Sequence, residues 1–191
     1  MLIELVKQGV RNILRNFLAV LFTGLVIKLM DDYLDQEIDR LNNRNSVAVK
    51  LKRGIVPYSL LLFSFAVLCN YKLSIALFWA SYIVGMGIDK TKVKIKLKAY
   101  QELTILLILG FWLLETTQFL FSLLIILFIQ AVDDYMDYYR EKYINKDNFI
   151  NYLGLGGTLF IIIFSLVFSL NLNWQLTVLI IAISCLINLL L

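Results

Sequence analysis

Histidine is absent from this 191-residue sequence, and cysteine occurs only twice. Without histidine the chain lacks the imidazole that serves as acid or base in many enzymes and as a ligand in most zinc and haem sites. The two cysteines, Cys69 and Cys185, fall in or beside apolar segments, and we interpret them as small apolar residues. These absences exclude histidine-based acid–base chemistry and most zinc or haem centres.

Charge is also scarce, because charged residues make up 17% of the sequence and hydrophobic residues 60%. Soluble domains usually contain about 25% charged and about 45–50% apolar residues. The mean hydropathy is +0.79, and a soluble core of this size could not bury so many leucine, isoleucine and phenylalanine side chains. The composition therefore predicts an integral membrane protein.

Seven segments are apolar enough to be membrane-spanning helices, although several are shorter than the about 20 residues that a crossing usually needs. They are Asn12–Met30, Val56–Cys69, Leu73–Ile88, Tyr100–Leu114, Thr117–Val132, Tyr152–Leu170 and Trp174–Leu191. Their apolar runs are unbroken rather than alternating, which argues against transmembrane strands. The connections Cys69–Lys72 and Asn171–Asn173 are too short for any extramembrane domain. The sequence therefore predicts an all-α, polytopic transmembrane bundle of about seven helices, with residues 1–191 forming a single integral membrane domain.

Most of the positive charge gathers in three of the predicted loops. These loops carry Arg40, Arg44, Lys50, Lys52 and Arg53, then Lys90, Lys92, Lys94, Lys96 and Lys98, then Arg140, Lys142 and Lys146. Seven crossings place the three loops on one side, and the positive-inside rule makes that side cytoplasmic. The other side has little charge beyond Lys72 and Glu115. We expect a multi-pass protein of the cytoplasmic membrane.

The N-terminus disagrees with this orientation, because Lys7, Arg11 and Arg15 precede or begin the first span on the predicted outer side. An amphipathic helix over Met1–Arg15, lying on the membrane surface, would explain these charges. A re-entrant hairpin over Leu2–Met30 is the alternative, and we favour the surface helix.

Two acidic patches continue membrane helices into the predicted cytoplasmic side. The first contains Asp31, Asp32, Asp35 and Asp39, and the second contains Asp133, Asp134, Asp137 and Glu141. At about 100° per residue, the four acids of each patch fall within an arc of about 100° on one helix face. The matched spacing, with the second copy four spans after the first, indicates two related halves that face each other.

Acids this close repel one another and are costly near hydrocarbon, so a bound cation would stabilise them. Mg²⁺ is the natural candidate, because it takes carboxylate oxygens and bridges to the phosphate oxygens of a substrate. We therefore predict that all eight acids contribute to a Mg²⁺ site. Nearby basic residues, predicted to bind a diphosphate, are Lys50, Arg53, Lys96, Lys98 and Arg140. The alternative interpretation is that both patches are ordinary solvated helix ends.

The two patches resemble the motifs of the UbiA superfamily of membrane prenyltransferases. Residues 31–39 fit its N/D-D-x-x-D-x-x-x-D motif, and Asp133 with Asp137 fits its D-x-x-x-D motif. The stretch Lys96-Leu97-Lys98-Ala99-Tyr100 is similar to the basic loop between the motif-bearing halves. Members of the family are usually longer, and the Arg-Pro pair often found after their first motif is absent here.

The resemblance implies a UbiA-like fold and Mg²⁺-dependent transfer of an isoprenyl group from an allylic prenyl diphosphate to a lipid or aromatic acceptor. Asp32, Asp35 and Asp137 are then the acids expected to matter most for catalysis. Aromatic faces can stabilise an allylic carbocation. The candidates for this role, each of which also suits packing or interfacial anchoring, are Tyr33, Trp79, Tyr82, Trp112 and Tyr135.

Other functions stay open at this point. A membrane terpene cyclase would use the same site and differ only in its product. A cation transporter would use the acids as ion ligands, although transporter acids usually lie near the bilayer midplane. A CDP-alcohol phosphotransferase is disfavoured because its D-G-x-x-A-R signature is missing, and an inactive scaffold because every motif acid is present. We expect membrane lipids but no nucleic acid as partners, and leave an oligomer or a partner subunit open.

Overall fold

The computed structural model describes residues 2–34, 36, 51, 54–86, 99–140 and 148–190. The helices in these ranges are α1 (Leu2–Leu34), α4 (Ile55–Ser81), α5 (Ala99–Leu113), α6 (Thr116–Arg140) and α7 (Phe149–Leu190), and α4 continues into the π-helix η2 (Tyr82–Met86). No strand occurs in the ranges described. The predicted all-α class is therefore confirmed for this part of the chain.

Four of the described helices are long and apolar enough to cross a membrane. These stretches are Lys7–Leu34, Ile55–Gly85, Thr116–Arg140 and Phe149–Leu190. The predicted span Tyr100–Leu114 corresponds to α5, which is apolar but has only 15 residues. The helix lengths and composition are those of an integral membrane protein, whereas the number of crossings and their orientation stay predictions.

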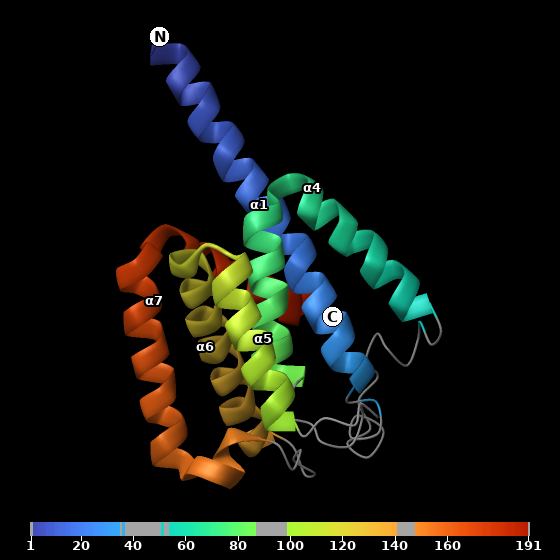
Figure 1. Ribbon diagram of the computed structural model, residues 1–191, viewed down its shortest axis with the longest axis vertical. Helices are drawn as coiled ribbons and strands as arrows, with labels where there is room; N and C mark the ends of the chain where they lie inside the picture. The colour runs from blue at the N-terminus through green and yellow to red at the C-terminus, as the bar shows by residue number, and fades with distance from the viewer. Residues whose placement is uncertain are drawn as a thin grey trace.

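α1 is one unbroken helix of 33 residues. Figure 1 shows its N-terminal part, in dark blue, projecting beyond the other helices. Because the helix does not reverse, the re-entrant hairpin considered for Leu2–Met30 is not the observed conformation. Residues 2–15 continue the same helix as the first predicted span, and their position at a membrane surface stays a prediction.

Two of the long helices, α4 and α7, break at an asparagine. The backbone is extended at Asn70 (φ −152°, ψ 94°) and at Asn173 (φ −158°, ψ 89°). Each asparagine accepts a hydrogen bond at its side-chain Oδ1 from the N–H three residues later, at 3.2 Å from Leu73 and 3.1 Å from Leu176, as an N-cap residue does. The chain turns back at both breaks (Figure 1). They fall in the two short connections predicted from the sequence.

The break in α4 is joined to α1 at the end of the molecule away from the acidic residues. The Asn70 side-chain amide donates a hydrogen bond to Oδ1 of Asn16 on α1 at 2.8 Å. Just after the break, Lys72 forms an ion pair with Glu115 at 3.6 Å. The two residues that the sequence places on the less charged side of the membrane therefore lie together.

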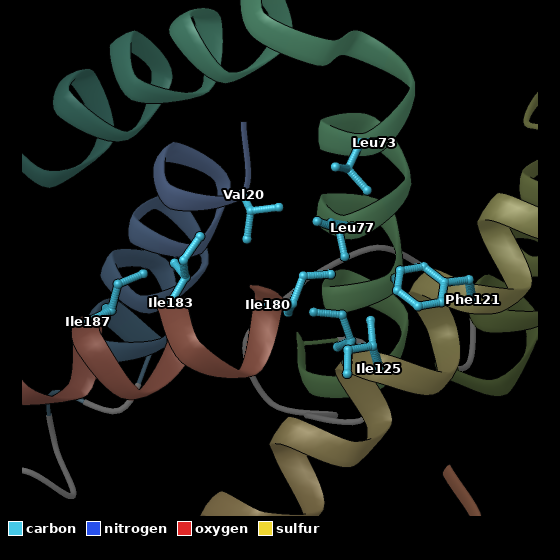
Figure 2. Close-up of a cluster of buried hydrophobic side chains, with 10 residues drawn as sticks. Val20, Leu73, Leu77, Phe121, Ile125, Ile180, Ile183 and Ile187 are labelled. Atoms are coloured by element: carbon cyan, nitrogen blue, oxygen red, sulfur yellow. The ribbon is translucent and has the colours of Figure 1, made fainter. Parts of the chain in front are cut away.

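A cluster of buried apolar side chains forms the core between α1, α4, α6 and residues 174–190, which we call the C-terminal arm of α7. The buried members of this cluster are Val20, Leu73, Leu77, Ala80, Phe121, Ile125, Ile126, Ile180, Ile183 and Ile187. Figure 2 shows the side chains of Leu77, Ile125 and Ile180 pointing toward one another from three of these helices. The C-terminal arm therefore returns to the centre of the bundle and packs beside α1.

Residues 155–172 of α7, which precede the Asn173 break, have one large and one small face. Phe160, Ile163 and Phe168 are exposed, whereas Ser165 and Ser169 are fully buried. Small residues allow close packing of helices in a membrane, and large apolar residues suit contact with lipid. The exposed face of this segment therefore fits a lipid environment.

Candidate functional site

A cleft opens between α1, the end of α4 with η2, α6 and the C-terminal arm of α7. The space between its walls, with its open mouth included, is about 830 Å³. Most of its wall is apolar and is formed by Val20, Ile27, Leu77, Ile126, Ile129, Ile180, Ile183 and Ile187. A cleft of this kind suits a ligand with a long apolar part.

The polar groups of the cleft come mainly from two helices. α1 contributes Lys28 and Asp31, and α6 contributes Gln130 and Asp133. All four residues follow the apolar wall residues of their own helix, and Figure 1 shows the C-terminal ends of α1 and α6 at the same end of the molecule. The first acid of each sequence motif, Asp31 or Asp133, therefore faces the same cleft.

Lys28 forms ion pairs with both acids that begin the first motif. Its Nζ lies 3.1 Å from Oδ1 of Asp32 and 3.8 Å from Oδ2 of Asp31. These are the i, i+4 and i, i+3 positions of α1, which are neighbours on a helix surface. Asp32 is only 7% exposed, so its carboxylate depends on the Lys28 ammonium for charge compensation, because a buried charge is costly unless it is paired.

Lys28 also interacts electrostatically with Asp133 across the cleft. One ammonium therefore faces three carboxylates, two from its own helix and one from α6. By formal charge this group carries two negative charges in excess. Such an excess favours the binding of a cation, and a divalent cation would neutralise it.

Asp134, although adjacent to Asp133, has a different role in the structure. It is 8% exposed, and its Oδ2 accepts a hydrogen bond from the backbone N–H of Phe149 at 2.7 Å. Gln130 Nε2 donates to its Oδ1 at 3.1 Å, and Asn148 Nδ2 donates to its backbone oxygen at 2.9 Å. Asp134 therefore satisfies a free N–H at the start of α7.

The remaining described residues of the second motif lie beyond the cleft wall. Asp137 is half-buried, and Arg140 is exposed at the end of α6. Neither residue lines the cleft. Around them Tyr135 and Tyr138 both pack against Tyr139 with ring centroids 5.2 Å apart. The structure thus brings Asp31 and Asp133 together but leaves Asp137 and Arg140 outside the cleft.

Several predicted site residues lie outside the described residues. These are the metal-site candidates Asp35, Asp39 and Glu141 and the diphosphate-binding candidates Lys50, Arg53, Lys96 and Lys98. Their assignments stay predictions.

The five aromatic residues considered for cation stabilisation all lie in the described part of the chain, and none of them lines the cleft. Trp79 Nε1 donates to the backbone oxygen of Leu106 at 3.2 Å, and Tyr82 donates to Oε1 of Glu102 at 2.6 Å. These contacts attach α5 to the end of α4 and to the start of η2. Trp112 is 78% exposed. These aromatic residues therefore have packing or surface positions.

The cleft includes functional candidates that the sequence interpretation missed. Lys28 lies within the first apolar segment, and its i, i+3 and i, i+4 spacing to Asp31 and Asp32 predicts an ion pair on the same helix face. Gln130 likewise precedes Asp134 by four residues. The other polar residues of the wall, Ser81, Ser184 and Asn188, have no comparable signal in the sequence.

The donor chemistry of the cleft fits Mg²⁺. Within the described ranges no three acidic side chains gather closely enough to hold one ion. Mg²⁺, however, usually keeps several waters and binds proteins through one or two carboxylates together with substrate phosphates. Asp31 and Asp133 supply two such carboxylates from opposite sides of one cleft, so they are the described residues that could hold the ion.

Comparisons with family models, with curated proteins and with solved structures each found no match to this chain. The resemblance to the UbiA superfamily therefore rests on the sequence motifs alone.

Proposed function

We propose that the protein is a UbiA-type membrane prenyltransferase, which moves an isoprenyl group from an allylic prenyl diphosphate to an acceptor in the membrane with the help of Mg²⁺. The observation that carries the proposal is the shared cleft. Asp31 and Asp133 begin two motifs about a hundred residues apart in the sequence, yet both line the polar end of a largely apolar cleft. A prenyl diphosphate has the matching form, with an apolar chain and a metal-binding head.

The breaks at Asn70 and Asn173 support the proposed count of seven crossings. At about 1.5 Å per residue, a straight helix of the length of α7 would extend about 63 Å, about twice the hydrocarbon thickness of about 30 Å. α7 has 42 residues and reverses direction at Asn173 (Figure 1), so two crossings account for its length. If α4 is likewise counted as two crossings, divided at Asn70, the proposed topology has the three basic loops and both acidic motifs on the cytoplasmic side.

In the proposed reaction the bond between C1 of the prenyl chain and the diphosphate oxygen breaks, and the diphosphate leaves with the electron pair. The acceptor then forms a bond to C1 and loses a proton. When bound, Mg²⁺ would neutralise charge that develops on the leaving diphosphate. Asp31 and Asp133 would orient the head at the cleft mouth, and the isoleucine-rich wall would bind the chain and exclude water from the reacting carbon.

The length of the cleft wall along α1 favours a short prenyl chain. Val20 and Lys28 both line the cleft, and the eight helical steps between them correspond to about 12 Å along α1. An extended chain advances about 1.2 Å per bond, since a three-bond peptide unit spans at most about 3.3–3.6 Å. This length corresponds to about ten bonds, or two to three isoprenyl units, so geranyl and farnesyl diphosphate are the preferred candidates.

The proposal is tested by measuring diphosphate release from a panel of allylic prenyl diphosphates with membranes that contain the protein, with and without Mg²⁺ and with a lipid extract as acceptor source. We expect Mg²⁺-dependent release that Asp31→Asn and Asp133→Asn each reduce by about a hundredfold or more. Glu115→Gln is the matched control, because Glu115 pairs with Lys72 at the other end of the bundle.

Release that is equal in the wild type and both aspartate variants, or no release from any of the diphosphates, would contradict the proposal. If release occurs, the lipid product separates a transferase from a terpene cyclase, because a cyclase converts the prenyl chain into a cyclic hydrocarbon or alcohol without consuming an acceptor.

A further inference from the structure

Lys28 is the one lysine among the residues that line the cleft. Its side chain is 29% exposed, and its ammonium contacts Asp32 at 3.1 Å and Asp31 at 3.8 Å. A lysine can bury its methylene chain along an apolar wall while its charged end reaches a polar region. Lys28 has this arrangement, because the apolar residues of the cleft precede it on α1.

The position of the ammonium has a consequence for metal binding. The carboxylates it faces include Asp31 and Asp133, which are the described groups that could hold a divalent cation. Two cations at the same carboxylates repel each other strongly unless they are well separated. Lys28 and a metal ion therefore compete for this end of the cleft.

We propose that Lys28 is the resident counter-cation of the metal-free site, and that a bound divalent cation displaces its ammonium from Asp31 and Asp32. This inference rests on the proposed function for the presence of a metal ion in the cleft. The flexible four-carbon chain of lysine allows the ammonium to move while its backbone stays fixed in α1. The displaced ammonium stays at the cleft mouth, where it can pair with the oxygens of a diphosphate.

The first test measures binding of Mn²⁺ alone, without any prenyl substrate, to the purified full chain in detergent by following the electron paramagnetic resonance signal of the free ion. Repulsion between the ammonium and a divalent ion at about 5 Å in a water-like medium corresponds to an affinity change on the order of tenfold. We therefore expect Lys28→Met to lower the Mn²⁺ Kd by about tenfold. Lys28→Arg, which keeps the charge, should raise affinity much less, and Lys72→Met should leave it unchanged.

A second test needs no variant. Wild-type protein is acetylated briefly with acetic anhydride, with and without Mg²⁺, and modification of each lysine is measured by mass spectrometry. We expect Mg²⁺ to increase acetylation of Lys28, because its ammonium leaves the carboxylates. Lys72 is the internal control, since it pairs with Glu115 far from the cleft.

The outcomes separate this inference from the proposed function. An equal Mn²⁺ Kd for wild type and Lys28→Met, or Lys28 acetylation that Mg²⁺ leaves unchanged, would overturn the displacement of Lys28 while leaving prenyl transfer open. Failure of the wild type to bind Mn²⁺, either alone or with inorganic diphosphate present, would overturn the displacement and the metal site together. Tighter binding by Lys28→Met without any diphosphate release by the wild type would support the role of Lys28 and contradict the proposed function.

Discussion

Asp133 and Asp134 are adjacent in one motif, yet the structure predicts opposite consequences for their replacement by alanine. Asp134 is buried and bound to Gln130 and to the backbone of Phe149, whereas Asp133 lines the cleft. We expect Asp134→Ala to lower the free energy of unfolding strongly. Asp133→Ala should leave the folded protein intact and remove its metal-dependent activity.

The size of the Asp134 effect follows from its hydrogen bonds. Without the carboxylate, the part-buried N–H of Phe149 loses its partner, which costs about 1–3 kcal/mol, and the bond from Gln130 contributes about 0.5–1.5 kcal/mol. Since these contributions are not additive, about 3 kcal/mol is the expected total. For Asp133 we expect a change below about 1 kcal/mol, because its removal also relieves repulsion between acids.

The comparison is made by titrating both purified variants from mild detergent into sodium dodecyl sulfate and following loss of helical structure, with Mn²⁺ binding measured on the folded protein. Equal stability of the two variants would refute the role of Asp134 in holding the start of α7. Asp134→Asn keeps an oxygen that can accept the N–H of Phe149, so loss of metal binding in this folded variant would show instead that Asp134 is a ligand, as the sequence motif predicts.

Two further predictions concern the cleft wall and the break in α7. A Cβ added at Gly24 would lie 2.7 Å from Cδ1 of Ile187, so Gly24→Ala should lower kcat/KM more for farnesyl than for geranyl diphosphate. A second substitution, Ile187→Val, should restore kcat/KM. An equal loss of kcat/KM for both chain lengths would contradict this account of the cleft wall. Asn173→Ala should lower the free energy of unfolding by about 1 kcal/mol through loss of the N-cap, as measured by detergent unfolding. Asn171→Ala is its control, and similar stability for the two variants would show that the cap contributes little.

Much of the fold follows from local sequence patterns. Long apolar runs predict membrane helices because the bilayer leaves every backbone polar group to be satisfied within the helix. Asn70 and Asn173 interrupt these runs, and their side chains replace the missing backbone partners at each new helix start. The positions of the two chain reversals were therefore predictable to within a few residues. The continuity of α1 was not, since a charged N-terminal segment suits a surface helix as well as an extension of the span.

The candidate site was predictable only in part. Helical spacing places Asp133 and Asp134 within one arc, but it does not reveal that Asp134 is held by the start of α7, since that contact depends on how the chain returns after α6. The approach of the C-terminal arm to α1, which leaves no room for a Cβ at Gly24 beside Ile187, depends in the same way on tertiary packing. Lys28 was within reach of sequence reasoning, because its two partners lie three and four residues away on the same helix.

The most direct test of the central claim is photo-cross-linking with a farnesyl diphosphate analogue that carries a diazirine at the end of its chain. Binding in the cleft predicts Mg²⁺-dependent labelling of residues around Val20 and Ile180, suppressed by unlabelled farnesyl diphosphate and lost in Asp133→Asn. Labelling that is confined to the outward face around Phe160 and Phe168, or that is unaffected by Mg²⁺ and by competitor, would contradict the assignment of this cleft as the prenyl diphosphate site.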